Sequence, residues 1–132
     1  MSQENIELAY RYEAALNARA VPEGLLAPGF VMVNASTAVT DKSYHGASGV
    51  VEWTTDMFEA WNTEARFEIE QVLVDGKDFV VTMNHIDGSG AGSGAPLMLR
   101  WPAVFWCGDG KLTRVVGYLD RREALEAVGL AE

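Results

Sequence analysis

Residues 97–120, LMLRWPAVFWCGDGKLTRVVGYLD, contain two long arms rich in aromatic and β-branched side chains. Gly108-Asp109-Gly110 lies between the arms, and both residue types tolerate the positive φ angles of a tight hairpin turn. The pattern therefore predicts paired antiparallel strands over residues 97–106 and 111–120. Because the second strand ends at Asp120, a carboxylate follows a largely apolar segment, and this Asp is the first candidate for chemistry.

The sequence before this hairpin alternates with the period of two that is typical of strands. A strand is predicted over residues 66–74, with Phe67, Ile69 and Leu73 on one face. A turn separates it from a second strand over residues 79–86. Together with the hairpin, these segments predict a four-stranded antiparallel meander.

Apolar residues at helical spacing dominate the first half of the chain. The elements predicted there are a helix over residues 6–19, a short helix over 22–26, a strand over 30–35, an irregular segment over 36–46 and a helix over 48–61. The last of these helices carries Trp53 and Met57 on its apolar face, where they belong to the core and are also placed to line a ligand cavity. A short helix over residues 121–128, stopped by Gly129, closes the chain.

This order of elements indicates an α+β fold with helices on one face of an antiparallel sheet. The hairpin is apolar on both of its faces, so helices on one side cannot cover it. The uncovered face predicts a self-association surface, most simply a two-fold homodimer through the sheet.

Composition and charge restrict the possible partners. A formal net charge of −9 argues against a nucleic-acid groove and against binding to an anionic membrane surface. Cys107 is the only cysteine, so neither a disulfide framework nor a thiolate metal cluster is expected. No apolar stretch reaches the roughly 18 residues of a membrane span, and no signal-like segment precedes the first helix. We expect one domain over residues 1–132, located in the cytoplasm.

Short motifs are spread along the chain: Tyr10-Arg11-Tyr12-Glu13-Ala14, Tyr44-His45-Gly46, Asp109-Gly110-Lys111, Tyr118-Leu119-Asp120-Arg121 and Glu123-Ala124-Leu125. Together they resemble the nuclear-transport-factor-2-like superfamily and, within it, the SnoaL-like group. The resemblance implies a cone: a strongly curved antiparallel or mixed sheet, N-terminal helices and a short C-terminal helix around a hydrophobic pocket, usually in a dimer. The superfamily includes ketosteroid isomerases, polyketide cyclases, epoxide hydrolases and ligand-binding proteins, so the fold alone does not assign chemistry.

The resemblance to ketosteroid isomerases carries over only in part. Those enzymes use a helical Tyr and a protonated Asp as oxyanion donors, and a second Asp as base. Tyr12 stands at the position of the helical Tyr, but the base position falls at Asn34 or near Thr37, and the second donor falls near Pro102. Neither Asn nor Thr takes a proton from carbon at neutral pH, and Pro has no backbone donor. Steroid-type isomerisation is therefore not expected.

The resemblance to epoxide hydrolases depends on one short motif. Those enzymes use an Arg-x-Asp pair in the middle of the sheet, and the nearest match here is His85-Ile86-Asp87. His replaces Arg, and a one-residue change of register would turn both side chains away from the cavity. Epoxide hydrolysis remains an alternative without further support.

The polyketide cyclases resemble this chain most closely. The resemblance implies that one Asp near the end of the last strand acts as acid or base on an activated, diketone-like substrate, and Asp120 occupies that position. The pocket walls would then hold the ring-closing conformation while the carboxylate moves a proton. Tyr118, Trp53 and Trp101 are the expected apolar neighbours of this carboxylate.

Several of these residues also have a purely structural interpretation. Asp120 precedes the terminal helix and is equally placed to cap it. His85 fits a half-exposed sheet residue as well as a second titratable group, and Tyr12 fits a core Tyr as well as a pocket donor. Arg100 needs a partner, which is either Glu68 or Glu70 from another strand or an anionic ligand group.

The predicted catalytic residues are Asp120, His85 and Tyr12, and the predicted substrate-binding residues are Trp53, Met57, Asn34, Arg100, Trp101 and Tyr118. No cofactor is expected, and two histidines far apart in the sequence predict no metal site. The preferred hypothesis is a proton-transfer enzyme of cyclase or isomerase type, acting on a hydrophobic, oxygenated small molecule. The alternative is a non-catalytic binder or interaction module of the same fold, and the sequence leaves both open.

Overall fold

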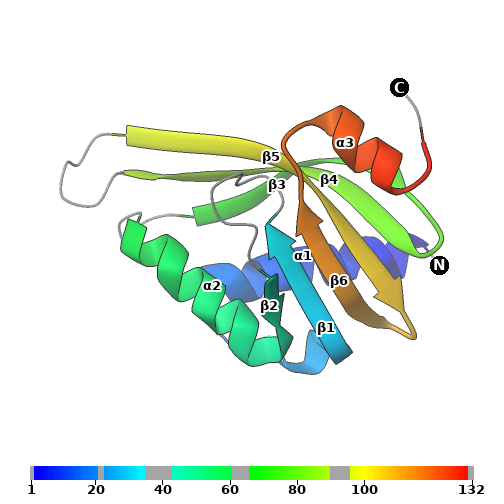
Figure 1. The fold of residues 1–132 in the computed structure, drawn as a ribbon, viewed down its shortest axis with the longest axis horizontal. Coiled ribbons are helices and arrows are strands. Elements are labelled where there is room, and N and C mark those ends of the chain that lie inside the picture. Colours follow the sequence, from blue (N-terminus) through cyan, green and yellow to red (C-terminus); the bar gives the residue numbers. More distant parts are fainter. Residues whose placement is uncertain (1, 21–22, 35–42, 61–65, 90–95, 131–132) are drawn as a thin grey trace.

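The computed structural model describes residues 2–20, 23–34, 43–60, 66–89 and 96–130. Their elements are α1 (Ser2–Asn17), η1 (Glu23–Leu25), β1 (Leu26–Asn34), β2 (Ser43–His45), α2 (Gly46–Ala60), β3 (Arg66–Asp75), β4 (Phe79–Ser89), β5 (Pro96–Gly108), β6 (Lys111–Gly117) and α3 (Arg121–Ala127), with η1 a 3₁₀-helix. The predicted α+β class is confirmed, and the strongly bent sheet is visible in Figure 1.

The six described strands form one sheet in the order β2-β1-β6-β5-β4-β3. Strands β3 to β6 make the predicted antiparallel meander, and β1 joins it by pairing parallel to β6. The predicted hairpin is confirmed, but its second strand ends at Gly117 and not at Asp120, which is the N-cap of α3. Asp109 and Gly110 have φ angles of 52° and 76°, which are the two positive angles of a two-residue turn between twisted strands.

The first strand and its neighbour differ from the prediction. β1 begins at Leu26 and not at residue 30 as predicted, because Pro28 and Gly29 lie inside the strand. Gly29 adopts a φ of 81°, and the register of β1 against β6 shifts between Leu26 and Val31, so the glycine marks an irregularity inside the strand. The short strand β2, which pairs antiparallel to β1, was not predicted because three residues carry too little periodicity.

The predicted face of β3 is correct only for its first half. Phe67 and Ile69 are buried together, as expected. The register against β4 then shifts twice, between Ile69 and Gln71 and again between Val72 and Val74. As a result Leu73 packs in a different cluster, against Val81, because each extra residue in a strand reverses the alternation of side chains that follow it.

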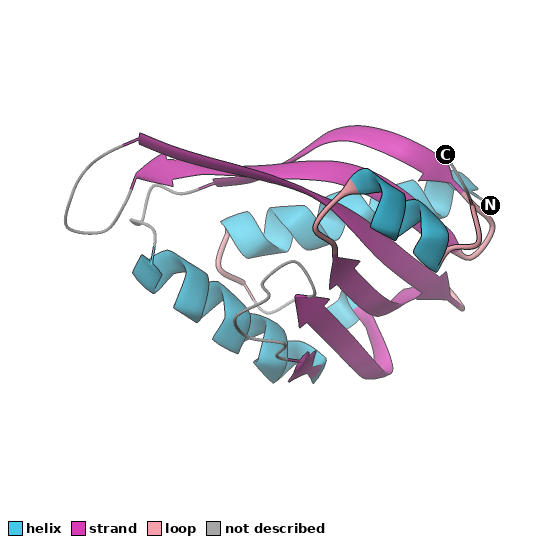
Figure 2. Ribbon diagram, turned by 45° about the horizontal axis from the view of Figure 1, so that its top comes forward, coloured by secondary structure: helices cyan, strands magenta, loops and turns pink. Residues whose placement is uncertain are grey.

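Helices cover both faces of the sheet, and not one face as the sequence predicted. α1 and α2 contribute to the main core cluster, whereas α3 packs through Ala124 against Val81 and Val104 in a second cluster. In Figure 1, α2 lies below the sheet and α3 above it, and Figure 2 shows the same two layers after rotation. We call the side toward α1 and α2 the inner face, and the side toward α3 the outer face. Within the described residues, no helix has the length and apolarity needed to cross a membrane.

Candidate active site

A cavity of about 80 Å³ lies between α1, α2 and the inner face of the sheet. One water molecule needs roughly 10–15 Å³ of such space, so this volume admits a small molecule. The described residues around it are mainly apolar and aromatic, and include Tyr12, Leu16, Trp53, Phe67, Trp101 and Phe105. The hollow is therefore present and the inner face is not completely filled by packed side chains.

Contacts between aromatic rings fix the walls of this cavity. The ring centroids of Tyr12 and Phe105 are 5.8 Å apart in an edge-to-face arrangement. Trp53 and Phe67 are 5.1 Å apart, and Phe67 meets Trp101 edge-to-face at 6.3 Å. Pairs at these separations are mutually stabilising, so helices α1 and α2 and the strands β3 and β5 present a preformed aromatic wall.

Three polar atoms buried at this cavity have no hydrogen-bond partner among the described residues. They are the hydroxyl oxygen of Tyr12, Oε1 of Glu13 and the indole nitrogen Nε1 of Trp53. Leaving such a group buried and unpaired costs about 1–3 kcal/mol each, so most native structures avoid it. Three unpaired groups around one hollow therefore point to a ligand whose polar atoms complete them.

Glu13 is the single carboxylic acid among the described residues that line the cavity, and no Lys, Arg or His accompanies it there. Its side chain is only 8% exposed. Burial raises the pKa of the Glu13 carboxyl to about 8; the charge of His85 opposes that rise, and Glu68 adds to it. The carboxyl is therefore protonated in acid and titrates near neutral pH, as expected of a general acid or base.

Glu13 belongs to the motif Tyr10-Arg11-Tyr12-Glu13-Ala14 but is absent from the predicted site residues. A signal was present, because Glu13 lies four residues after Ala9 and three before Leu16, inside the apolar stripe of α1. An acidic residue in such a stripe is buried if the helix packs tightly, and Ala9 and Leu16 are both buried. Burial also raises the pKa of the neighbouring Tyr12 hydroxyl, with a smaller contribution from Glu13, so that hydroxyl stays protonated.

Asn84 on β4 adds an amide to the inner face. It is 2% exposed and lines the cavity. The hydroxyl of Thr82, itself fully buried, donates to Oδ1 of Asn84 at 3.1 Å. The Asn84 Nδ2 atom is 3.5 Å from the carbonyl oxygen of Trp101, a long contact that leaves its donor capacity largely unused. Thr82 thus holds the amide with its nitrogen available to the cavity.

Three of the predicted site residues meet at this cavity: Tyr12, Trp53 and Trp101. The side chains of Asn34 and Met57 lie outside the part of the chain that the structure describes, and the roles predicted for them stay predictions.

Asp120 and Tyr118, at the end of the meander, lie away from the cavity lining. Asp120 is exposed and caps α3: its Oδ1 accepts a hydrogen bond from the backbone N–H of Glu123 at 2.9 Å. Tyr118 packs against the outer cluster under α3. The capping interpretation of Asp120 is confirmed, and its predicted role as acid or base stays a prediction without a contact to the cavity.

His85 and Arg100 lie side by side on the outer face, where His85 pairs across the strands with Arg100. Nε and Nη2 of Arg100 donate to Oε2 of Glu70 at 3.0 and 2.8 Å, so the predicted ion pair exists. Asp87 shares this face with His85, and Ile86 between them is fully buried. His85 and Asp87 therefore point away from the cavity. This is the orientation expected if the strand register differs by one residue from the one that the epoxide hydrolase motif needs.

The comparisons with known proteins agree with this architecture. Residues 9–115 match the sequence model of the family described as the SnoaL-like domain. No curated protein matches the chain. A solved structure from Catenulispora acidiphila, with a ketosteroid isomerase-like fold and in complex with trimethylamine, shares 17% identity over 94% of this chain and 93% of its own, with a TM-score of 0.70.

Two further solved structures are similar. A putative SnoaL-like polyketide cyclase from Jannaschia sp. CCS1 shares 21% identity over 88% of this chain and 85% of its own, with a TM-score of 0.65. TerC, co-crystallised with polyporic acid, shares 18% identity over 89% of this chain and 92% of its own, with a TM-score of 0.74. At these identities the likeness shows the fold alone.

Proposed function

This chain belongs to the SnoaL-like family, and we propose that it is a cofactor-free enzyme. The proposed enzyme moves a proton on a hydrophobic, oxygenated small molecule. The observation that carries the proposal is the buried carboxyl of Glu13, unpaired at Oε1, at the wall of an aromatic cavity. A cyclisation or an isomerisation of an activated ketone fits this arrangement, because both need one acid/base group and a shaped apolar hollow.

In the proposed mechanism, Glu13 takes a proton from carbon or returns one to it. The charge that develops on the substrate oxygen needs donors that are already oriented toward it. The Tyr12 hydroxyl and the Trp53 indole N–H are buried and have no hydrogen-bond partner among the described residues, so both supply such a donor without first breaking another hydrogen bond. The Asn84 amide is a further donor, or orients a second oxygen of the substrate.

Glu13 is a better acid/base candidate than Asp120 on electrostatic grounds. The Asp120 carboxylate is exposed and already accepts a hydrogen bond from the helix that it caps. Glu13 is buried, so the pKa of its carboxyl is raised toward neutral pH. Water does not screen the charge of the carboxylate there. Epoxide hydrolysis is not proposed, because His85 and Asp87 lie on the outer face.

The test compares three single variants with the wild type on a panel of polyketide-like ketones and enones. Glu13→Gln should lower kcat by at least about 100-fold, the usual contribution of a general acid or base. Asp120→Asn and Glu7→Gln, the latter an exposed position on the same helix as Glu13, should keep turnover within about twofold. Full activity of Glu13→Gln, or loss only in Asp120→Asn, would remove Glu13 from the mechanism.

A second candidate function is binding of a small amine without catalysis. The cavity combines one carboxyl with faces of Tyr12, Trp53, Phe67 and Trp101, and aromatic faces attract ammonium groups. The structure from Catenulispora acidiphila was solved with trimethylamine. Calorimetry with trimethylammonium above pH 8 distinguishes the two functions. A binding protein is favoured if the wild type binds trimethylammonium saturably, Glu13→Gln does not bind it, and the wild type does not turn over ketones.

We also propose a homodimer through the outer face. α3 covers only part of that face, over Val81 and Val104. The remainder carries exposed charges of both signs, with Arg100 at 57% and Glu68 at 62% side-chain exposure. A two-fold axis that brings Arg100 of one copy opposite the acidic side chains of the other would favour association of two copies.

A further inference from the structure

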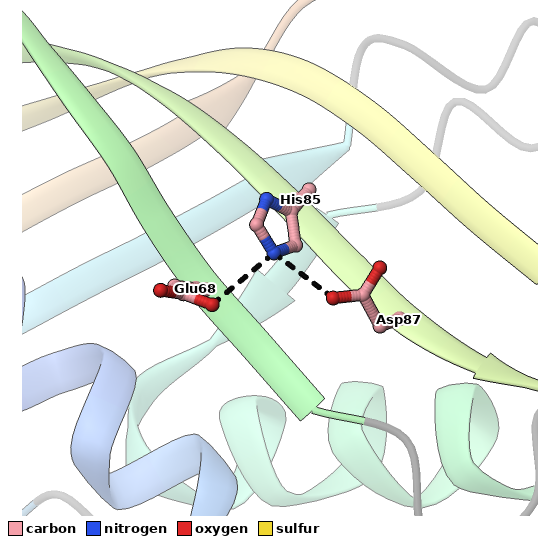
Figure 3. Close-up of side chains that lie close together, drawn as sticks. All are labelled: Glu68, His85 and Asp87. Carbon is pink, nitrogen blue, oxygen red and sulfur yellow. Dashed lines mark ion pairs between the residues drawn. The ribbon is translucent and has the colours of Figure 1, made fainter.

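The outer face holds a cluster of side chains with the donor atoms of a metal site. Glu68 on β3 lies directly opposite His85 on β4, and Asp87 follows two residues later on the same face. One carboxylate oxygen from each acid and Nε2 of His85 all lie within 4.8 Å of one another. Figure 3 shows both carboxylates turned toward the same nitrogen.

The spacing of these atoms is close to that of ligands around one ion. Nε2 of His85 is 3.3 Å from Oε2 of Glu68 and 3.1 Å from Oδ2 of Asp87. Nitrogen and oxygen ligands bind Zn²⁺ at about 2.0–2.2 Å, so neighbouring ligands at angles between 90° and tetrahedral stand roughly 3.0–3.4 Å apart. Both nitrogen–oxygen separations fall in that interval, and only the two carboxylates need to close on each other.

The other side of the imidazole is already held. Nδ1 of His85 is 3.0 Å from Oε1 of Glu70. Oε2 of Glu70 in turn accepts a hydrogen bond from Nη2 of Arg100 at 2.8 Å. A metal-binding His usually donates its second N–H to a carboxylate, which fixes the ring and its tautomer. With Nδ1–H directed at Glu70, the lone pair of Nε2 is directed at Glu68 and Asp87.

We propose that Glu68, His85 and Asp87 bind one divalent transition-metal ion on the outer face, with Glu70 and Arg100 as positioning residues. One imidazole and two carboxylates suit a borderline ion such as Zn²⁺, whereas Mg²⁺ prefers oxygen and water. Glu68 and Asp87 are 62% and 56% exposed in the single chain, so an ion reaches the site from solvent and keeps open positions wherever a second copy does not cover this part of the outer face. An imidazolium paired with the same carboxylates is the competing arrangement.

The experiment is calorimetric titration of the EDTA-treated, full-length chain with ZnCl₂. Wild type should bind one Zn²⁺ per chain, and excess Mg²⁺ should not displace it. His85→Gln should lose this binding, while the matched control His45→Gln, which removes the exposed imidazole on β2, should retain it. Glu70→Gln should weaken binding by about 10- to 100-fold, the usual effect of removing the carboxylate behind a ligating His.

Three outcomes would overturn the site: no stoichiometric binding to wild type, equal affinity in wild type and His85→Gln, or loss of binding in His45→Gln alone. Circular dichroism establishes that His85→Gln is folded. Should that variant unfold, Asp87→Asn at an exposed position tests the same prediction, and undiminished binding by it would equally contradict the site. Zinc binding and ketone turnover are separate readouts, so the proposed enzyme activity is tested on its own, although the charges of His85 and Glu68 also act on the pKa of Glu13.

Discussion

At the scale of single residues, burial gives two carboxyl groups of this protein opposite properties. Glu13 is 8% exposed with an unpaired oxygen at the cavity, whereas Asp120 is exposed and hydrogen-bonded to the end of a helix. Burial raises the pKa of the Glu13 carboxyl to about 8. The environment, and not the residue type, makes Glu13 the candidate for proton transfer.

The raised pKa of Glu13 predicts how stability depends on pH. Between its ordinary pKa of 4.5 and about 8, the folded protein holds a proton that the unfolded chain releases. The free energy of unfolding therefore falls as pH rises through this window, at up to about 1.4 kcal/mol per pH unit from this group. Urea denaturation at several pH values measures the effect.

Glu13→Gln isolates this contribution, because Gln holds no titrating proton. The difference in unfolding free energy between wild type and Glu13→Gln should change steeply from pH 5 to 8 and level off above about 8. Glu7→Gln, an exposed change on α1, should leave the wild-type pH dependence intact. Parallel curves for wild type and Glu13→Gln would show that the carboxyl of Glu13 is not buried.

Tyr12→Phe separates a role in ligand binding from a role in the core. The ring of Tyr12 packs against Phe30 and Phe105, and Phe keeps those contacts. The hydroxyl is buried without a partner, so its removal should leave stability unchanged or raise it by about 1 kcal/mol. Substrate turnover should fall in the same variant. A loss of stability of about 2 kcal/mol or more in thermal unfolding would mean that the hydroxyl is paired in the protein.

At the scale of elements, α3 depends on its two ends. Asp120 caps the start, and at the other end Gly129, with a φ of 80°, stops the helix while the N–H of Leu130 donates to the carbonyl of Leu125 at 2.8 Å. Between them Ala124 packs on Val81 and Val104, so a short helix of seven residues covers part of the outer face.

Asp120→Ala should therefore act on stability. Loss of an N-cap costs about 1 kcal/mol, and α3 has too few residues to form without tertiary support. We expect a lower midpoint in urea and an unchanged kcat. Asp120→Ser, which keeps a capping oxygen, should restore most of the stability. If Asp120→Ala were as stable as wild type but inactive, Asp120 would take part in the reaction.

At the scale of the whole molecule, the sheet separates two surfaces of different character. Its inner face and the helices α1 and α2 enclose an aromatic cavity with one carboxyl. Its outer face carries α3 and a network of charged side chains around His85. Neighbouring residues of one strand serve both surfaces: Asn84 lines the cavity, and His85 next to it faces outward.

The proposed homodimer is tested by light scattering coupled to size exclusion, in buffer that contains EDTA. Wild type should have about twice the 14.4 kDa mass of one chain. Arg100→Glu should shift the population toward monomer, because it places a like charge opposite the acids of the partner. Arg11→Glu, an exposed charge reversal on α1 and so on the other side of the sheet, is the control and should remain dimeric. A monomeric wild type would end the proposal.

Local signals in the amino-acid sequence are sufficient to specify several elements. The positive-φ residues Asp109 and Gly110 specify the central hairpin, and the periodic segments specify α1, α2 and the meander. Asp120 and Gly129 mark the ends of α3 in the sequence as they do in the structure. These features depend on residues a few positions apart, so short-range sterics and hydrogen bonding are sufficient to fix them.

The side of the sheet that each polar residue faces depends on contacts between residues far apart in the sequence. Two shifts of register in β3 moved Leu73 from the expected face. Successive side chains of a strand alternate between the two faces, so Asn84 points inward, whereas His85 and its partner Arg100 point outward. Glu13 became a site residue because α1 packs over the inner face, many residues away in sequence. Side-chain direction in a strand reverses with every extra residue, and burial depends on partners far along the chain, so local patterns do not determine either.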